Sequence, residues 1–507
     1  MKRKGEERER ERVVSMVMWF RIAFIVAATL LLLEVGVVNG RRRNACDASF
    51  PSEVGPMVKP FVDIFTQEPI RLLGFRLLDP SADKVVENSS MVIERGIITD
   101  IGYGVEVGLP GVRTLDIDLT GKTVMPGLVM LHEHIFYPSK FDSLHVYANQ
   151  YYSAPKLYLA KGVTTSRTAG CNHPFSDLAL VDDVTQYRQV GPRMHMTAPY
   201  LDGPLSEYPQ NMRLRDGEDA YRSVLYWFDR GFTNFKLYKW ATAEIAQASI
   251  NAAHSVGAKI TGHLCAVTFE QAIDMGIDCL EHGLMVDTEF VPTKEYDVCP
   301  LDELVDAIAA VDVTSPRVDA LIARLVESGT AVTSTLPVFE TLVPGRPDPP
   351  PGAFDAMLPE AAQVYRAKRA RIDQDVNSSY TAAFANEMAF EKRLFDAGGL
   401  LLAGTDPTSY GGNVPGFGSH RELELLVEAG FTPLEALRIA TLHGAMYLEE
   451  DDCVGSIGTG MLADLLVLDG NPATNIADIS TISTVFRAGI GYNPDRLLQA
   501  IHNDVSW

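Results

Sequence analysis

An apolar run that ends in two histidines occupies residues 126–134, Pro126-Gly127-Leu128-Val129-Met130-Leu131-His132-Glu133-His134. Alternate residues of a β-strand point to the same face, so this pattern places His132 and His134 together at the carboxyl end of a strand. Two neighbouring imidazoles are a natural pair of ligands for a divalent metal. Histidine pairs also occur in ordinary cores and on surfaces, so the rest of the chain must distinguish these explanations.

Eight strand-like segments alternate with helix-like segments over about 300 residues. They cover residues 124–134, 162–166, 193–197, 234–238, 259–263, 279–282, 331–335 and 400–406. One of the intervening helices is marked by Ser315 and Pro316 at its start and by Gly329 after its last turn. Eight strands that alternate with helices predict an α/β fold, the (β/α)8 or TIM barrel.

Shorter β-type runs flank the predicted barrel on both sides. Residues 70–124 and 451–507 contain the alternating apolar residues and turn residues of an antiparallel sheet. We expect them to be two halves of one small β-sandwich domain formed from both chain ends, with the barrel of residues 125–450 inserted between them. Residues 41–69 are expected to be a linker.

The first 40 residues differ in composition from the rest. A charged segment precedes the apolar run of residues 22–33, which is short for a membrane span but suits a signal peptide. Val38 and Gly40 provide the small residues that precede a cleavage site. The sequence therefore favours a cleaved signal and a secreted or extracytoplasmic protein. The alternative is a membrane anchor over residues 13–38.

The composition excludes some functions. A net charge of −22 over 507 residues argues against binding nucleic acid through a basic face. The six cysteines contain no CxxC pair, so the fold does not depend on a disulfide framework, although one or two disulfides are compatible with export. We expect a small-molecule partner, and the sequence leaves a homo-oligomer open.

Chemically capable side chains end several of the predicted strands. Active sites of (β/α)8 barrels lie at the carboxyl ends of the strands, so these side chains are expected to converge. They are His132, His134, Lys236, His263, His282 and Asp406. Each alone has an ordinary explanation, such as a core histidine, a rim lysine or a helix-capping aspartate. Six of them at strand ends indicate one site.

These motifs resemble the amidohydrolase superfamily, in the branch of imidazolonepropionase-like hydrolases and metal-dependent prolidases. The resemblance covers residues 70–490, and its most specific segments are 126–134, 162–165, 262–263, 281–283, 404–406 and 458–469. The chain departs from the family pattern at Met130, where the family usually has an aspartate. It departs again after the second predicted strand. The family often has an arginine followed by an aspartate there, and this chain has Arg167 followed by Thr168.

The resemblance implies a site for two divalent metal ions. The first would be bound by His132, His134 and Asp406, and the second by His263 and His282. Lys236 would bridge them after its amine has reacted with carbon dioxide, because a lysine carbamate offers two anionic oxygens. Imidazole and carboxylate ligands suit zinc, while manganese, iron and cobalt stay open.

By the same resemblance, the protein is a metal-dependent hydrolase that cleaves the C–N bond of a dipeptide or an N-acyl amino acid. A hydroxide that bridges the metals would attack the amide carbonyl. Asp406 would transfer the proton to the leaving nitrogen. Tyr238 lies two residues past Lys236 and so on the same strand face, where it would either stabilise the oxyanion or pack within the barrel. Weaker candidates for substrate contacts are His173, His195 and Arg167.

Three alternative functions fit the same scaffold. They are hydrolysis of a cyclic amide such as an imidazolone or hydantoin, deamination, and binding without catalysis. Mononuclear deaminases of this kind place a glutamate three residues after the histidine equivalent to His263, and this chain has Ala266 there. All six ligand types are present, which argues against a binding protein that has lost its metals.

Overall fold

The computed structural model describes residue 46 and residues 50–138 and 147–506. The chain divides into two compact units, residues 1–47 and 48–507. The predicted signal peptide or membrane anchor lies outside the described residues. Within the described ranges, no helix is both long and apolar enough to cross a membrane.

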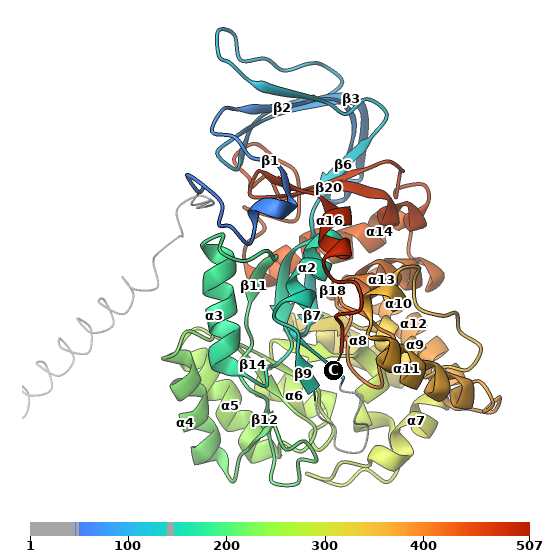
Figure 1. Ribbon diagram of the computed structural model, residues 1–507. Helices are drawn as coiled ribbons and strands as arrows, with labels where there is room; N and C mark the ends of the chain where they lie inside the picture. Colours follow the sequence, from blue (N-terminus) through green and yellow to red (C-terminus); the bar gives the residue numbers. More distant parts are fainter. Residues whose placement is uncertain (1–45, 47–49, 139–146, 507) are drawn as a thin grey trace, which may run out of the picture. The chain divides into compact units, whose positions relative to one another are not determined.

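Eight parallel strands form the centre of the unit of residues 48–507 (Figure 1). They are β7 (Leu128–Glu133), β10 (Val163–Thr168), β11 (Arg193–His195), β14 (Asn234–Leu237), β15 (Lys259–Gly262), β16 (Cys279–Glu281), β17 (Ala331–Ser334) and β18 (Leu401–Ala403). They belong to two sheets, one with the order β11-β10-β7 and one with the order β14-β15-β16-β17-β18. Two minor strands, β12 (Leu201–Asp202) and β13 (Met212–Arg213), extend the second sheet beside β14.

The two sheets meet at both of their edges. On one side, Thr197 forms a parallel bridge with Asn234. On the other side, the amides of Thr405 and Asp406 both donate to the carbonyl of His132, at 3.1 and 2.9 Å. The second junction brings Asp406 beside the end of β7.

α-Helices follow most of the central strands, and others lie in the longer connections and near the end of the chain. They are α2 (Ser153–Ala160), α3 (Pro174–Thr185), α4 (Gly217–Phe228), α5 (Ala243–Ser255), α6 (Phe269–Met275), α7 (Leu301–Ala309), α8 (Pro316–Ser328), α9 (Leu336–Glu340), α10 (Ala353–Ala356), α11 (Pro359–Ile372), α12 (Tyr380–Asp396), α13 (Phe417–Glu428), α14 (Pro433–Arg438), α15 (Gly444–Leu448) and α16 (Pro494–Gln499). The ends of α8 are confirmed: Ser315 is its N-cap, and Gly329 terminates it with a positive φ of 71°.

The single strand expected over residues 124–134 is two strands in the structure. β6 (Thr123–Pro126) and β7 are separated by Gly127, and they belong to different sheets. A Cβ atom on Gly127 would lie only 2.1 Å from the Thr164 hydroxyl, so the backbone approaches β10 closely here. The prediction was wrong on this point because a continuous apolar run does not reveal a change of sheet.

Strands from both ends of the chain form one nine-stranded sheet. Its order is β1-β21-β20-β19-β6-β2-β3-β4, with β5 paired to β2. The strands are β1 (Val62–Ile64), β2 (Ile70–Asp79), β3 (Lys84–Glu94), β4 (Ile97–Gly102), β5 (Leu115–Asp118), β6, β19 (Leu465–Leu468), β20 (Ile482–Arg487) and β21 (Ile490–Tyr492). Figure 1 shows these blue and red segments together at one end of the unit. The sheet has its own hydrophobic core, which includes Leu72, Phe75 and Phe486.

Two further details of the fold differ from expectation or add to it. β1 lies within the segment that was expected to be a linker, and it pairs with β21. Cys265 and Cys299 form a disulfide, and Cys171 and Cys279 are free and buried. The cross-link begins only two residues after His263.

Candidate metal centre

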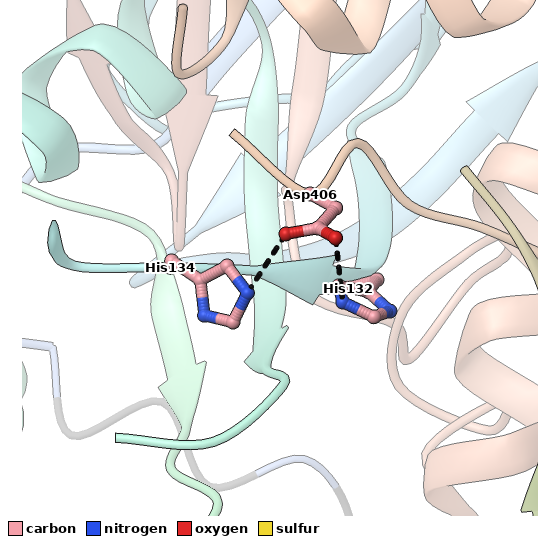
Figure 2. A group of neighbouring side chains, drawn as sticks. All are labelled: His132, His134 and Asp406. Carbon is pink, nitrogen blue, oxygen red and sulfur yellow. Dashed lines mark ion pairs between the residues drawn. The ribbon is translucent and has the colours of Figure 1, made fainter. Parts of the chain in front are cut away.

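His132, His134 and Asp406 form a compact group at the carboxyl ends of β7 and β18. Their candidate ligand atoms lie within 4.8 Å of one another. His134 Nε2 is 3.1 Å from Asp406 Oδ1, and His132 Nε2 is 3.7 Å from Asp406 Oδ2. Figure 2 shows both imidazole rings directed toward the carboxylate, one at each oxygen. The two histidines are buried, so this arrangement can bind a metal ion away from bulk water.

Three further predicted residues border this group. Lys236 Nζ lies 3.3 Å from His132 Nε2, and His282 Nε2 lies 3.8 Å from Asp406 Oδ2. The ring of His263 is 4.5 Å from that of His282 between centroids. The structure therefore brings together all six residues that the sequence analysis selected.

The backbone turns at two of these residues. His282 and Asp406 have positive φ angles of 71° and 48°, which non-glycine residues rarely adopt. Each is in the loop that follows its strand rather than at the strand's last position. Such backbone strain is maintained by the surrounding structure and is common at functional sites.

Glu281 orients His132 from behind. Its Oε2 is 2.6 Å from His132 Nδ1, and its Oε1 accepts from Arg167 Nη2 at 2.6 Å and from the Thr261 hydroxyl at 2.5 Å. Although burial disfavours its charged form, the guanidinium of Arg167 holds the pKa of Glu281 well below its usual range. An ionised Glu281 accepts the Nδ1 proton of His132 and leaves Nε2 free to face the site.

Thr335 has the same role for His282. Its hydroxyl lies 2.8 Å from His282 Nδ1. His282 Nε2 is buried and has no hydrogen-bond partner among the described residues. Burial lowers the pKa of His282 well below its usual value, so the ring is neutral and Nε2 is an available lone pair. A buried lone pair without a donor fits a metal ligand.

A cavity of about 400 Å³ opens beside this group. Its aromatic wall consists of Phe136, Tyr147, Tyr200, Tyr208 and Tyr238, and its amide side chains are Asn172, Gln210 and Asn211. His134, Lys236, His263 and Asp406 also line it. The candidate metal ligands are thus accessible to a small molecule.

The amidohydrolase family matches residues 123–490. The chain belongs to the amidohydrolase family. Members act as hydrolases on carbon–nitrogen bonds and generally bind divalent metals, and the family implies a TIM-barrel fold for the central strands. The group of two histidines and an aspartate provides suitable ligands in this amidohydrolase.

Several solved structures share this fold. A candidate prolidase from Bifidobacterium longum is 24% identical, with a TM-score of 0.62, and the match covers 86% of this chain and 99% of that one. A Xaa-Pro dipeptidase with bound methionine in its active site is 20% identical, with a TM-score of 0.62 and coverage of 84% and 100%. A molinate hydrolase is 18% identical, with a TM-score of 0.60 and coverage of 85% and 96%. No curated protein matches the chain.

The weaker candidates for substrate contacts do not line the cavity. Arg167 is fully buried and paired with Glu281, and it also donates to the Leu131 carbonyl at 2.8 Å. His195 Nε2 lies 3.3 Å from a carboxylate oxygen of Glu450. His173 is the residue before α3, and its neighbour Asn172 lines the cavity instead. In this amidohydrolase, Arg167 therefore supports the metal centre from behind.

The sequence did not indicate Glu281, Thr335 or most of the cavity wall. In the sequence, Glu281 is the neighbour of His282 at a strand end. Because successive side chains of a strand point to opposite faces, Glu281 is expected to face away from His282. Tyr200 and Tyr208 come from segments with little regular structure, and no pattern in the sequence distinguished them. Tyr238 was selected, and it lines the cavity as expected.

Proposed function

We propose that this amidohydrolase is a metal-dependent hydrolase of dipeptides or N-acyl amino acids. The observation that carries the proposal is the convergence of three buried imidazoles (His132, His134 and His282), the partly buried His263 and the Asp406 carboxylate beside a cavity. Among the described residues, His282 Nε2 has no hydrogen-bond partner. The likeness to a prolidase candidate and to a Xaa-Pro dipeptidase supports a peptide-like amide.

The proposed ligands divide into two groups. One ion would be held by His132, His134 and Asp406, and the other by His263 and His282. The Lys236 amine, as a carbamate, would lie between them. When bound, two divalent ions polarise the substrate carbonyl and acidify water for attack. Zinc suits this set of nitrogen and oxygen donors.

The chain's own residues would carry the proton and orient the substrate. An Asp406 carboxylate oxygen accepts the proton of the attacking water and returns it to the leaving nitrogen. The Tyr238 hydroxyl donates to the carbonyl oxygen as negative charge develops there. Burial raises the pKa of Tyr238 well above its usual value, so the hydroxyl keeps its proton for this role. The aromatic wall excludes water around the bond that breaks.

Metal content and hydrolysis test this proposal together. The metal-replete wild type is expected to contain about two ions per chain and to hydrolyse members of a panel of N-acyl amino acids and dipeptides. His132→Ala should preferentially lose one ion, and His282→Ala the other. His254→Ala is the matched control, since His254 is half exposed and pairs with Asp278 on the surface.

Two results would overturn the proposal. Elemental analysis that gives one ion or none removes the binuclear site. A protein that retains both ions and hydrolyses no member of the panel is not a dipeptide or N-acyl amino acid hydrolase. Cyclic amides in the same panel then test the alternative substrate class.

We also propose that the nine-stranded sheet is layered as a β-sandwich and that the mature protein is exported after loss of its first 40 residues. The separate hydrophobic core of the sheet supports the first idea. The short apolar run of residues 22–33 supports the second. Intact-mass analysis of exported protein tests the cleavage, and a chain that still begins near Met1 would favour a membrane anchor.

A further inference from the structure

We infer that Lys239 binds a carboxylate of the substrate, and that Glu207 competes with the substrate for it. This inference rests on the proposed function. It assigns recognition of a carboxylate on the amine product to one residue. Lys236 is the only ammonium or guanidinium among the described residues that line the cavity, and its proposed role is in the metal centre. A substrate carboxylate therefore needs a second cation.

Lys239 lies close to two rings of the aromatic wall. Its Nζ is 5.1 Å from the ring centroid of Tyr208 and 5.9 Å from that of Tyr238, and both rings line the cavity. The two rings are 5.6 Å apart and meet edge to face. The ammonium is thus near two tyrosines of the cavity wall, and the same wall includes the amides of Gln210 and Asn211 as further donors.

The ammonium is buried but weakly paired. Lys239 is only 7% exposed. Its ion pair is with Glu207, whose oxygen is 3.9 Å away on a side chain that is 41% exposed. This distance is too long for a hydrogen bond, and a carboxylate exposed to water loses little when it is displaced. A ligand carboxylate in direct contact with the ammonium would form the stronger, charge-assisted hydrogen bond.

The backbone around Lys239 is held firmly. The Ala266 amide donates to the Lys239 carbonyl at 2.9 Å, and the Trp240 amide donates to Asp202 Oδ1 at 2.9 Å. Asp202 also accepts from Asn211 Nδ2 at 3.1 Å, which ties the cavity wall to the same carboxylate. The lysine is therefore presented from a fixed position, and its reach into the cavity depends on the side chain alone.

The test compares a free acid with its uncharged analogue. N-acetyl-L-phenylalanine and N-acetyl-L-phenylalanine amide share the scissile acetyl bond and differ only in the carboxylate, and released acetate reports hydrolysis. In the wild type the acid should be preferred. Lys239→Met should reduce the acid-to-amide ratio of kcat/KM by about 10- to 100-fold, the loss expected for one charge-assisted hydrogen bond. Lys59→Met, which removes an exposed positive charge from η1 (Lys59–Phe61), is the control for net charge.

Glu207→Gln provides the opposite perturbation. Removing the competing carboxylate should raise the affinity for the acid by a few-fold without a matching gain for the amide. Because Glu207 is exposed, this variant is expected to fold, so it decides the assignment even if Lys239→Met does not fold. Calorimetric binding of L-phenylalanine and L-phenylalanine amide gives the same comparison without turnover.

The outcomes separate this inference from the proposed function. An unchanged acid-to-amide ratio in Lys239→Met, or equal binding of acid and amide in Glu207→Gln and wild type, overturns the carboxylate site while hydrolysis stands. If the wild type hydrolyses neither compound, the proposed function fails for this substrate. The calorimetric comparison then still decides whether Lys239 binds a carboxylate.

Discussion

Lys236 occupies a position in which a simple ammonium ion is poorly stabilised. It is 1% exposed, and it forms no ion pair within the described residues. Its Nζ lies 3.3 Å from the Nε2 atom of His132. Burial lowers the pKa of Lys236 to about 8. A neutral amine is the form that reacts with carbon dioxide, so the environment is compatible with a carbamate.

Replacing Lys236 tests this chemistry directly. Lys236→Ala should lose most of the turnover and part of the metal, because the proposed bridge is removed. Propionate should restore part of both by occupying the vacated volume with a carboxylate. Lys236→Arg should not be rescued, since its fixed positive charge fills the site and repels metals. Metal content and turnover, with and without propionate, are the measurements. Full activity and both ions in Lys236→Ala would end the carbamate proposal.

A second prediction concerns Arg167, which stabilises the charge of Glu281. Removing one partner of a buried ion pair leaves an uncompensated charge, so Arg167→Leu should lower the free energy of unfolding by about 3–5 kcal/mol. Denaturant unfolding measures this loss. Arg188→Leu is the control, because the pairs of Arg188 with Asp182 and Asp183 are exposed to solvent and stabilise the fold little. Equal effects of the two variants would contradict a supporting role for Arg167.

Single residues were predictable from the sequence where chemistry and strand position coincide. Histidines, a lysine and an aspartate at strand ends are rare enough together to indicate one site. Glu281 and Lys239 were missed because their roles depend on which neighbours surround them. Arg167 was given a substrate contact, yet it donates to Glu281, which lies on β16 in the other sheet. Such contacts between strands are not visible along the chain.

At the scale of elements, buried carboxyl groups lie between the central strands and the helices that cover them. Glu387 and Glu391 lie on α12, and Glu422 lies on α13. Glu387 Oε2 accepts from the Met285 amide at 2.8 Å, and Glu391 Oε2 accepts from the Ser334 hydroxyl at 2.9 Å. No ion pair reaches these three carboxyls in the part of the chain that the structure describes. Uncompensated buried carboxyls are stable only when protonated.

Stability should therefore fall at alkaline pH. Burial raises the pKa of Glu387 to about 8 from an ordinary value of 4.5, and that of Glu391 well above its usual value. A carboxyl with a raised pKa in the folded state contributes stability that is complete below pH 4.5 and is lost as the pH rises through about 8. The unfolding free energy of the wild type should decrease across this window, and that of Glu387→Gln should decrease less.

Unfolding midpoints from pH 5 to pH 9 measure this effect. Glu327→Gln, on the exposed face of α8, is the control and should follow the wild type. Parallel curves for the wild type and Glu387→Gln would show that Glu387 is already ionised in the folded protein. The difference between variants isolates the carboxyl, since the histidines of the metal centre titrate in all of them.

The sequence predicted the number of central strands better than it predicted where each strand begins and ends. All eight candidate segments contain a central strand, because alternation and turn residues mark each one. Their ends were less certain: His282 and Asp406 were expected within strands, but both turn out of them with positive φ. Minor strands β12 and β13 have two residues each and carry no periodic signal. The change of sheet at Gly127 depends on Thr164, which is distant in sequence.

At the scale of the whole unit of residues 48–507, the terminal sheet joins the two ends of the chain. β19 lies between β6 and β20, so neither half of the sheet is complete without the other. The similar texture of the two regions predicted this union. The sequence did not reveal how the sheet is attached to the central strands, and one buried side chain at that junction is Asp464.

Asp464 connects the two parts through three contacts. Its Oδ2 accepts from Arg193 Nη1 of β11 at 3.0 Å, its Oδ1 accepts from the Ala488 amide at 2.6 Å, and its carbonyl accepts from the Gly127 amide at 2.9 Å. The carboxylate is thus shared between a central strand and the terminal sheet. The residue is 4% exposed, so water cannot replace these partners.

Asp464→Ala should lower the free energy of unfolding by about 2–4 kcal/mol, because it leaves a buried amide and a partly buried guanidinium without their acceptor. Asp469→Ala is the matched control, since its carboxylate is 62% exposed and pairs with Lys122 on the surface. Calorimetry should give one thermal transition for the wild type and an earlier or divided transition for Asp464→Ala. If both variants melt like the wild type, the sheet and the central strands are held together by apolar packing alone, and the buried carboxylate is not needed for their attachment.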